Sequence, residues 1–105
     1  MKLVHVDNTT RSMDIQVDHN SERQRFETRL DNRLAYLSYT FQGSSVFFDH
    51  TFVPAEFRGK GVASALVRTG LEEARRQQWK IVPSCSYVAA FIARHPEFGD
   101  LVAVE

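Results

Sequence analysis

A glycine loop with two basic residues stands directly before the most regular amphipathic segment of the chain. It reads Arg58-Gly59-Lys60-Gly61. Glycines let the backbone adopt positive φ angles and approach a ligand closely, and the first N–H groups of a helix have no carbonyl partner inside it. These N–H groups, the positive end of the helix dipole and two mobile cations favour an anion. The spacing therefore predicts an anion-binding loop, and the alternative interpretation is an ordinary loop at a helix start.

Cys85 is the second group that could carry chemistry. It lies between a short strand-like segment and the last helical segment. A thiol at a helix start can be stabilised as the thiolate, which is the nucleophilic form. The alternative is a small buried hydrophobic residue. Cys85 is the one cysteine of the chain, so an intramolecular disulfide is excluded.

Two further residues offer acid–base groups near the loop and the cysteine. His50 is predicted to share a strand face with Phe48 and Phe52, which also fits a histidine packed in a core or cleft. Tyr87 falls in the first turn of the last helix, where its phenol could protonate a leaving thiolate or could only pack. Both residues are therefore catalytic candidates with a structural alternative.

The remaining titratable residues give weaker indications. Asp49 and His95 are further candidates for a general base. Neither the four histidines nor Cys85 shows the spacing of metal ligands, so no metal site is expected. The histidines are His5, His19, His50 and His95.

The composition indicates one globular domain. The chain has 105 residues, of which 43% are hydrophobic and 25% charged. Thirteen basic residues balance thirteen acidic ones, so no overall field favours nucleic acid or a membrane surface, and anion recognition must be local. The start of the chain has no continuous apolar run, so a cytoplasmic location is the expectation.

Alternating apolar and polar residues before the loop predict strands. They cover residues 15–17, 26–30, 34–41 and 45–53. Asp31-Asn32 and residues 42–44 are predicted as hairpin turns. Residues 1–14 are interpreted as an N-terminal arm or edge strand, with the polar run 7–12 as a loop. Residues 45–53 are apolar on both faces, which predicts a central strand.

A helix, a short strand and a second helix follow the loop. The first helix is predicted from apolar or small residues at Ala63, Leu66, Val67, Gly70, Leu71 and Ala74. Residues 80–83 predict the strand, and the last helix runs from residue 87 to about residue 94 with Ser84 or Ser86 as its cap. The fold class is therefore α/β (α+β): an antiparallel meander, a right-handed β-α-β crossover and a C-terminal helix.

Two prolines predict where a cleft opens in this sheet. Pro54 and Pro83 each follow one of the two parallel strands and cannot donate to a strand ladder. The strands should separate there, with the glycine loop at the mouth of the opening, as is typical of ligand sites at the carboxyl ends of parallel strands.

The loop resembles a known cofactor signature. Arg58, Gly61 and Ala63 match the pattern R/Q-x-x-G-x-G/A, in which the chain is similar to the GNAT N-acetyltransferase superfamily. The resemblance extends over residues 15–102 and is closest to the compact YjdJ-type branch in segments 50–54, 82–88 and 95–98. A P-loop NTPase is excluded because Val62 stands where a Lys-Ser/Thr pair is required.

The resemblance implies a GNAT-like domain over residues 15–105 that binds acetyl-CoA and releases CoA. The backbone around Phe52 and Val53 would face the pantetheine and the thioester. The loop and helix start would hold the pyrophosphate; these residues are Arg58, Gly59, Lys60, Gly61, Val62, Ala63 and Ser64.

The implied activity is acetyl transfer to an unidentified amine of a small molecule, peptide or protein. Either the amine attacks the thioester directly, or Cys85 first takes the acetyl group; the YjdJ-type branch carries this cysteine in the same Pro-Ser-Cys context. The alternative function is a non-catalytic CoA-binding or protein-interaction module. The balanced charge argues against a nucleic-acid binder.

Overall fold

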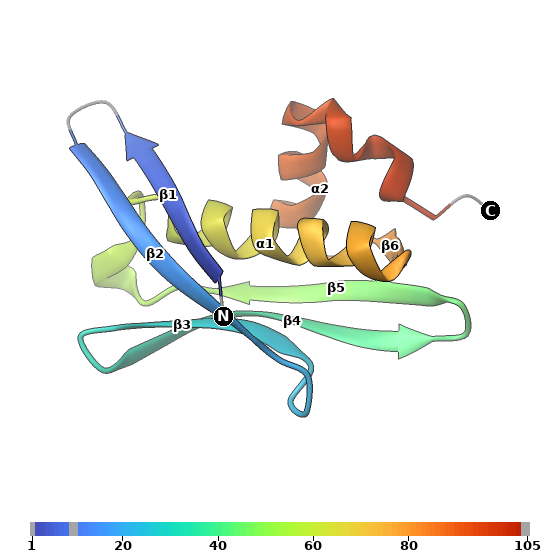
Figure 1. Ribbon diagram of the computed structural model, residues 1–105, viewed down its shortest axis with the longest axis horizontal. Helices are drawn as coiled ribbons and strands as arrows, with labels where there is room; N and C mark the ends of the chain where they lie inside the picture. The colour runs from blue at the N-terminus through green and yellow to red at the C-terminus, as the bar shows by residue number, and fades with distance from the viewer. Residues whose placement is uncertain (1, 9–10, 104–105) are drawn as a thin grey trace.

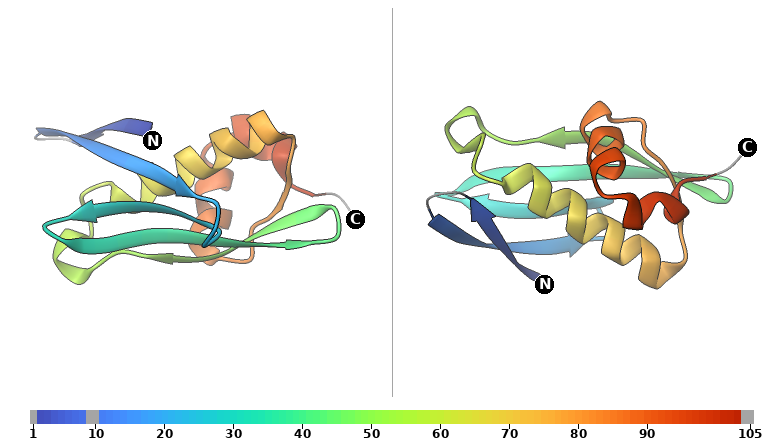
Figure 2. Two further views of the ribbon diagram at one scale, coloured as in Figure 1. Left: turned by 60° about the horizontal axis from the view of Figure 1, so that its bottom comes forward. Right: turned by 90° about the horizontal axis from the view of Figure 1, so that it is seen from above.

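The fold is one six-stranded sheet with two helices on the same face (Figures 1 and 2). The computed structural model describes residues 2–8 and 11–103. The strands are β1 (Lys2–Asn8), β2 (Arg11–Asn20), β3 (Arg25–Leu30), β4 (Arg33–Gln42), β5 (Ser45–Phe52) and β6 (Lys80–Val82). The helices are α1 (Val62–Gln77) and α2 (Ser86–Arg94), with short 3-10 helices η1 (Ala55–Phe57) and η2 (Pro96–Leu101).

The sheet topology confirms the predicted fold class. Strands lie in the order β1-β2-β3-β4-β5-β6, with every pair from β1 to β5 antiparallel and β6 parallel to β5. The crossover from β5 to β6 contains α1, and β5 has a strand on each side, as predicted for a central strand. None of the helices in the described part of the chain is long and apolar enough to cross a membrane.

In the first half of the sheet, the predicted turn at residues 31–32 is confirmed and the predicted loop at residues 7–12 is wrong. Asp31 and Asn32 have φ angles of 50° and 64° between β3 and β4, which is the left-handed pair of a two-residue hairpin. The polar run 7–12 was predicted as a loop, but Asp7 pairs with Ser12 and Asn8 with Arg11, while residues 9–10 lie outside the described residues. Backbone pairing in this hairpin gives the peptide N–H and C=O groups hydrogen-bond partners. Strands can therefore form here although the sequence does not alternate between apolar and polar residues.

The core lies between α1 and the face of the sheet that α1 covers. Gly70 stands at the closest approach, where an added Cβ would lie 3.0 Å from Leu37 Cδ2 and 3.1 Å from Phe48 Cε2. Leu37, Phe48 and the neighbouring Phe26 are completely buried. The small residue predicted on this helix face therefore allows the helix to lie directly on three large side chains.

A β-bulge in β5 changes which residues face the helices. Tyr39 of β4 pairs with Phe48, whereas the preceding Ser38 pairs with His50, so Asp49 is an extra residue in β5. The prediction that His50 and Phe52 share the face of Phe48 is therefore wrong. Thr51 instead pairs with buried Leu37 and lies on the helix-covered face. The extra residue turns His50 to the opposite face of the sheet.

Candidate functional site

The site begins where β5 and β6 separate. Their pairing ends at Phe47 and Val82, and the next backbone bond runs from Cys85 N to Phe48 O at 3.0 Å. Pro83 follows β6 at this point and has no N–H to continue the ladder. Beyond Phe48, β5 runs on to Phe52 with β4 as its paired neighbour, so the opening lies between its second half and the start of α2. The separation therefore begins before Pro54, where it was predicted on the β5 side, and only Pro83 stands at the point where pairing ends.

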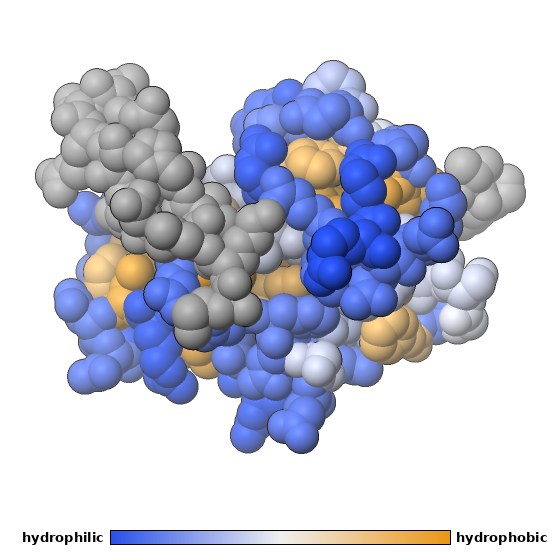
Figure 3. Space-filling view, in the orientation of Figure 1, coloured by the Kyte–Doolittle hydropathy of each residue, from blue (hydrophilic) through white to orange (hydrophobic). Residues whose placement is uncertain are grey.

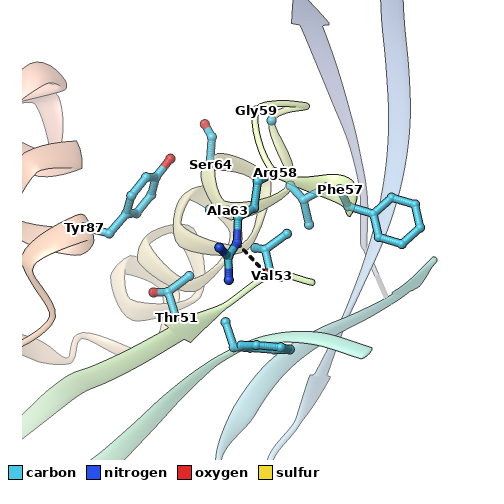
Figure 4. Close-up of a pocket in the computed structure, with 11 residues that line it drawn as sticks. Thr51, Val53, Phe57, Arg58, Gly59, Ala63, Ser64 and Tyr87 are labelled. Atoms are coloured by element: carbon cyan, nitrogen blue, oxygen red, sulfur yellow. Dashed lines mark hydrogen bonds between the residues drawn. The ribbon is translucent and has the colours of Figure 1, made fainter. Parts of the chain in front are cut away.

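A cavity of about 430 Å³ occupies this opening (Figure 4). It is lined by β5, the loop, the start of α1 and one side chain of α2: Thr51, Phe52, Val53, Phe57, Arg58, Gly59, Gly61, Val62, Ala63, Ser64 and Tyr87. The residues predicted to bind the cofactor are therefore brought together, except that Lys60 is not part of the lining. Thr51 and Phe57 are lining residues that sequence reasoning missed.

The start of α1 presents backbone donors to this cavity. Gly59 and Gly61 have φ angles of 78° and 84°, which only glycine adopts without strain. The first helical bond runs from Ala65 N to Gly61 O at 3.0 Å. The N–H groups of Val62, Ala63 and Ser64 therefore have no acceptor inside the helix, and all three residues line the cavity. This is the geometry and the dipole polarity that bind a phosphate.

Arg58 is anchored rather than mobile. Its Nε donates to the carbonyl oxygen of Val53 at 3.0 Å, so the side chain folds back across the end of β5 (Figure 4). The rest of the guanidinium keeps its charge beside the cavity, because Arg58 is exposed to solvent. Arg58 and Lys60 were predicted as two mobile cations, but this hydrogen bond holds the Arg58 side chain in place.

Thr51 links the cavity to Cys85. The Thr51 Oγ1 and Cys85 Sγ atoms lie 3.5 Å apart; Thr51 lines the cavity and Cys85 does not. Burial opposes ionisation of the thiol, but hydrogen bonds from the Thr51 hydroxyl and from backbone N–H groups, those of Val88 and Tyr87 among them, outweigh it, so the pKa of Cys85 lies below its usual value. Cys85 itself is the N-cap of α2, not Ser84 or Ser86 as predicted.

The three other acid–base candidates have different surroundings. The phenol of Tyr87 reaches from α2 toward Ser64 at the start of α1, and burial raises its pKa (Figure 4). His50 is exposed on the opposite face of the sheet, with its ring 6.1 Å from that of Tyr36. His95 stacks on Phe91, and its Nδ1 lies 2.8 Å from the Phe91 carbonyl oxygen. Of the predicted catalytic residues, the structure therefore places Tyr87 in the cavity lining and Cys85 outside the lining but in contact with Thr51, whereas His50 lies on the other face of the sheet.

Asp49 lies at the bulge, near the separation of the strands. Its carboxylate accepts hydrogen bonds from Thr40 Oγ1 at 2.9 Å and from Ser84 Oγ at 3.4 Å. These bonds tie β4 and β5 to the turn that precedes Cys85. Within residues 2–8 and 11–103, no group of three or more histidine, cysteine, aspartate or glutamate residues could hold a metal ion.

The mixed sheet, the opening between β5 and α2 and the free N–H groups at the start of α1 are the features expected of a protein that binds a phosphate-bearing ligand. A family model described as GCN5-related N-acetyl-transferase matches residues 25–101. The chain belongs to this family of acetyltransferases, and its place in the GNAT superfamily is confirmed.

Relatives and a solved structure agree with this assignment. The chain is 30% identical to Protein NATD1 of Xenopus tropicalis over 94 residues, which cover 87% of the chain and 86% of that protein. It is 31% identical to Protein NATD1 of Gallus gallus over 85 residues, which cover 78% and 77%. The solution structure of a GCN5-like protein from Staphylococcus aureus superimposes with a TM-score of 0.67 and 28% identity, covering 86% of the chain and 90% of that protein.

The environment of Cys85 predicts a measurable pKa effect. Thr51→Val removes the hydroxyl beside the sulfur, so the pKa of Cys85 rises and less thiolate is present at neutral pH. Alkylation by iodoacetamide at neutral pH should slow by roughly threefold to tenfold, the effect of losing one hydrogen bond to the thiolate. The measurement is the alkylation rate as a function of pH. Thr69→Val, at a buried residue of α1 that does not line this cavity, is the control, and an unchanged profile in Thr51→Val contradicts the assigned hydrogen bond.

Proposed function

We propose that the protein is an acetyl-CoA-dependent N-acetyltransferase that acts on an amine. The observation that carries the proposal is the cavity where β5 and β6 separate, with the free N–H groups of the first turn of α1 in its wall. The family assignment supports acetyl transfer as the reaction class. The finer assignment to the YjdJ-type branch and the cytoplasmic location belong to the same proposal.

The cavity suggests how acetyl-CoA would lie. The pyrophosphate would accept hydrogen bonds from the N–H groups of Gly61 to Ser64, beside the anchored Arg58 and with Lys60 in the same loop. The pantetheine would follow the edge of β5 at Phe52 and Val53, where the backbone has lost its β6 neighbour. The thioester would then reach Thr51 and Tyr87, which stand at the Cys85 end of the cavity.

Two routes of transfer are compatible with these positions. In the direct route, the neutral amine attacks the thioester carbon, CoA thiolate leaves, and the amine loses its extra proton to water. In the covalent route, the Cys85 thiolate attacks the same carbon and CoA thiolate leaves. The neutral amine then attacks the acetyl-cysteine, loses its extra proton to water and regenerates the Cys85 thiolate. In both, the protonated phenol of Tyr87 can donate a proton to the CoA sulfur.

The local chemistry favours the covalent route. The pKa of the thiol is lowered by the hydrogen bonds described above, and the sulfur lies 3.5 Å from the hydroxyl of Thr51, which lines the cavity. The described lining residues include no carboxylate or imidazole that could deprotonate an amine directly. We give His50 no role in the transfer, because its side chain lies on the other face of the sheet.

The acceptor would enter an open site. The hairpin loops are short, with two residues between β3 and β4 and two between β4 and β5. Such turns cannot enclose a small molecule, so a peptide or protein amine is the favoured acceptor. A second candidate function is a CoA-binding or protein-interaction module without catalysis, which the lack of a general base in the cavity lining favours.

Calorimetric titration tests cofactor binding. Acetyl-CoA and CoA should bind the parent protein, whereas Gly61→Trp should lose binding, because its side chain enters the anion-binding turn and the positive φ becomes strained. Gly43→Trp is the matched control, since Gly43 also has a positive φ and lies in the distant β4–β5 turn. It should bind like the parent, and absence of binding by the parent would refute the proposed function.

Intact-mass analysis distinguishes the two routes and the non-catalytic alternative. After mixing with acetyl-CoA, the parent should carry one acetyl adduct that hydroxylamine removes and that Cys85→Ala lacks. A protein that binds CoA, shows no adduct and still acetylates amines uses the direct route. Binding with neither an adduct nor transfer to any amine of a broad panel would instead support the non-catalytic module.

A further inference from the structure

The cavity proposed for acetyl-CoA reaches both faces of the sheet. Thr51 and Phe52 are consecutive residues of β5, so their side chains point to opposite faces. Thr51 lies on the face that α1 and α2 cover, yet both residues line the same cavity. The cavity therefore extends around the open edge of β5, from the helix-covered face to the opposite, uncovered face of the sheet.

The helix-covered side of the cavity is bounded by protein groups. Tyr87 reaches from α2 toward Ser64 at the start of α1, and Cys85 lies in contact with Thr51 (Figure 4). Both α-helices lie on this one face of the sheet (Figure 2). An acceptor that approaches from the uncovered face avoids both helices, and it meets the cavity at Phe52.

Two aromatic side chains form an apolar patch where the cavity opens on the uncovered face. The ring centres of Phe52 and Tyr36 lie 5.8 Å apart, and the two residues pair across β4 and β5. Tyr36 points to the uncovered face, because its strand neighbours Ala35 and Leu37 are completely buried on the other one. Tyr36 does not line the cavity, so it is not part of the proposed cofactor site. This pair is the Tyr36–Phe52 patch.

Exposed apolar side chains of this size are few in the described part of the chain. Phe41 and Phe52 are the two large hydrophobic residues exposed there, at 51% and 38%. The coloured surface in Figure 3 is mainly hydrophilic, with small separate hydrophobic patches. Phe41 lies beside the β4–β5 turn and does not line the cavity. Phe52 is therefore the exposed apolar residue that is continuous with the proposed site.

The neighbours of the patch favour an apolar ligand group over a basic one. The Arg25 guanidinium lies 5.4 Å from the centre of the Tyr36 ring, so a cation already occupies that ring and would repel a second one. Glu27 stands opposite Tyr36 on β3, but its carboxylate is bonded to Arg25 and to Asn20. The Phe52 ring offers apolar surface alone. The patch therefore fits an apolar side chain.

A side chain packed on the patch would place the next residue of its peptide at the mouth of the cavity. The proposed position of the thioester is beside Thr51, which is adjacent to Phe52 in β5. Successive residues of an extended peptide are about 3.3 Å apart, so a neighbouring amine is within reach of this position. We propose that the acceptor peptide lies on the uncovered face of the sheet, with an apolar residue next to the acetylated amine packed on Tyr36 and Phe52. This inference rests on the proposed acetyl transfer.

The test uses peptides that carry one amine and differ in the residues beside it. Each peptide of the first set has five residues, both ends blocked and a central lysine flanked on both sides by leucine, serine or arginine. A second set without lysine has a free N-terminal amine with the same three residues beside it. In the set that is acetylated, the leucine peptide should have a KM roughly tenfold below that of the serine peptide, and the arginine peptide should be no better than serine. In the ¹⁵N-labelled protein with CoA, the leucine peptide should shift the amides of residues 36 and 50–52.

The outcomes separate this inference from the proposed function. Failure of acetyl-CoA to bind in the calorimetric titration would refute the proposed function itself. Binding of acetyl-CoA without acetylation of any of these peptides would refute the inference alone. Equal KM values within the acetylated set, or amide shifts confined to α1 and α2, would do the same.

Substitution of Tyr36 tests the patch without altering the cofactor site. Tyr36→Thr keeps a strand-forming residue and removes the ring, so the KM of the leucine peptide should rise roughly threefold to tenfold, while the KM of the serine peptide and the Kd of acetyl-CoA stay the same. Tyr36→Phe should behave like the parent, because the patch uses the ring. Phe41→Thr, at the other exposed phenylalanine, is the matched control and should leave all three constants unchanged. An unchanged KM in Tyr36→Thr, or an equal rise in Phe41→Thr, would contradict the assignment.

Discussion

The separation of β5 from the chain that follows β6 is the constraint on which the site depends. One hydrogen bond, from Cys85 N to Phe48 O, is the last backbone link between these two segments. On one side of it, β6 completes the sheet; on the other, the edge of β5 lies open and the first turn of α1 faces it. Cys85 makes this last hydrogen bond and is also the N-cap of α2. Its position beside Thr51 therefore follows from the point at which the pairing ends.

The β-bulge at Asp49 determines which side chains of β5 face this opening. An unbroken alternation would direct His50 and Phe52 toward the helices. The extra residue directs Thr51 there instead, and Thr51 both lines the cavity and lowers the pKa of Cys85. The Asp49 side chain is bonded to Thr40 and Ser84, so the bulge is tied to the neighbouring strand and to the turn before Cys85. The β-bulge therefore determines that Thr51 lies beside Cys85, and so it contributes to the lowered pKa of the thiol in this acetyltransferase-family fold.

Much of the fold followed from local signals in the sequence. The glycines at 59 and 61, the period of α1, the Asp31-Asn32 turn and the proline after β6 each impose a backbone geometry that needs few distant partners. The bulge and the pairing of the polar N-terminal hairpin depend on neighbouring strands, so alternation alone gave the wrong face for His50 and a loop for residues 7–12. For the same reason Thr51 was missed, since nothing in its own sequence context marks it. The loop residues alone predict a site for a phosphate-bearing anion. The inference that this ligand is acetyl-CoA comes from the family resemblance.

The most direct test of the account is a crystal structure of the protein with acetyl-CoA. The account predicts pyrophosphate oxygens within hydrogen-bond distance of the N–H groups of residues 61–64, pantetheine along the edge of β5 at Phe52 and Val53, and the thioester beside Thr51, Tyr87 and Cys85. Acetyl-CoA bound away from the opening between β5 and α2, or an opening closed by continued pairing of β5 beyond Phe48, would contradict it.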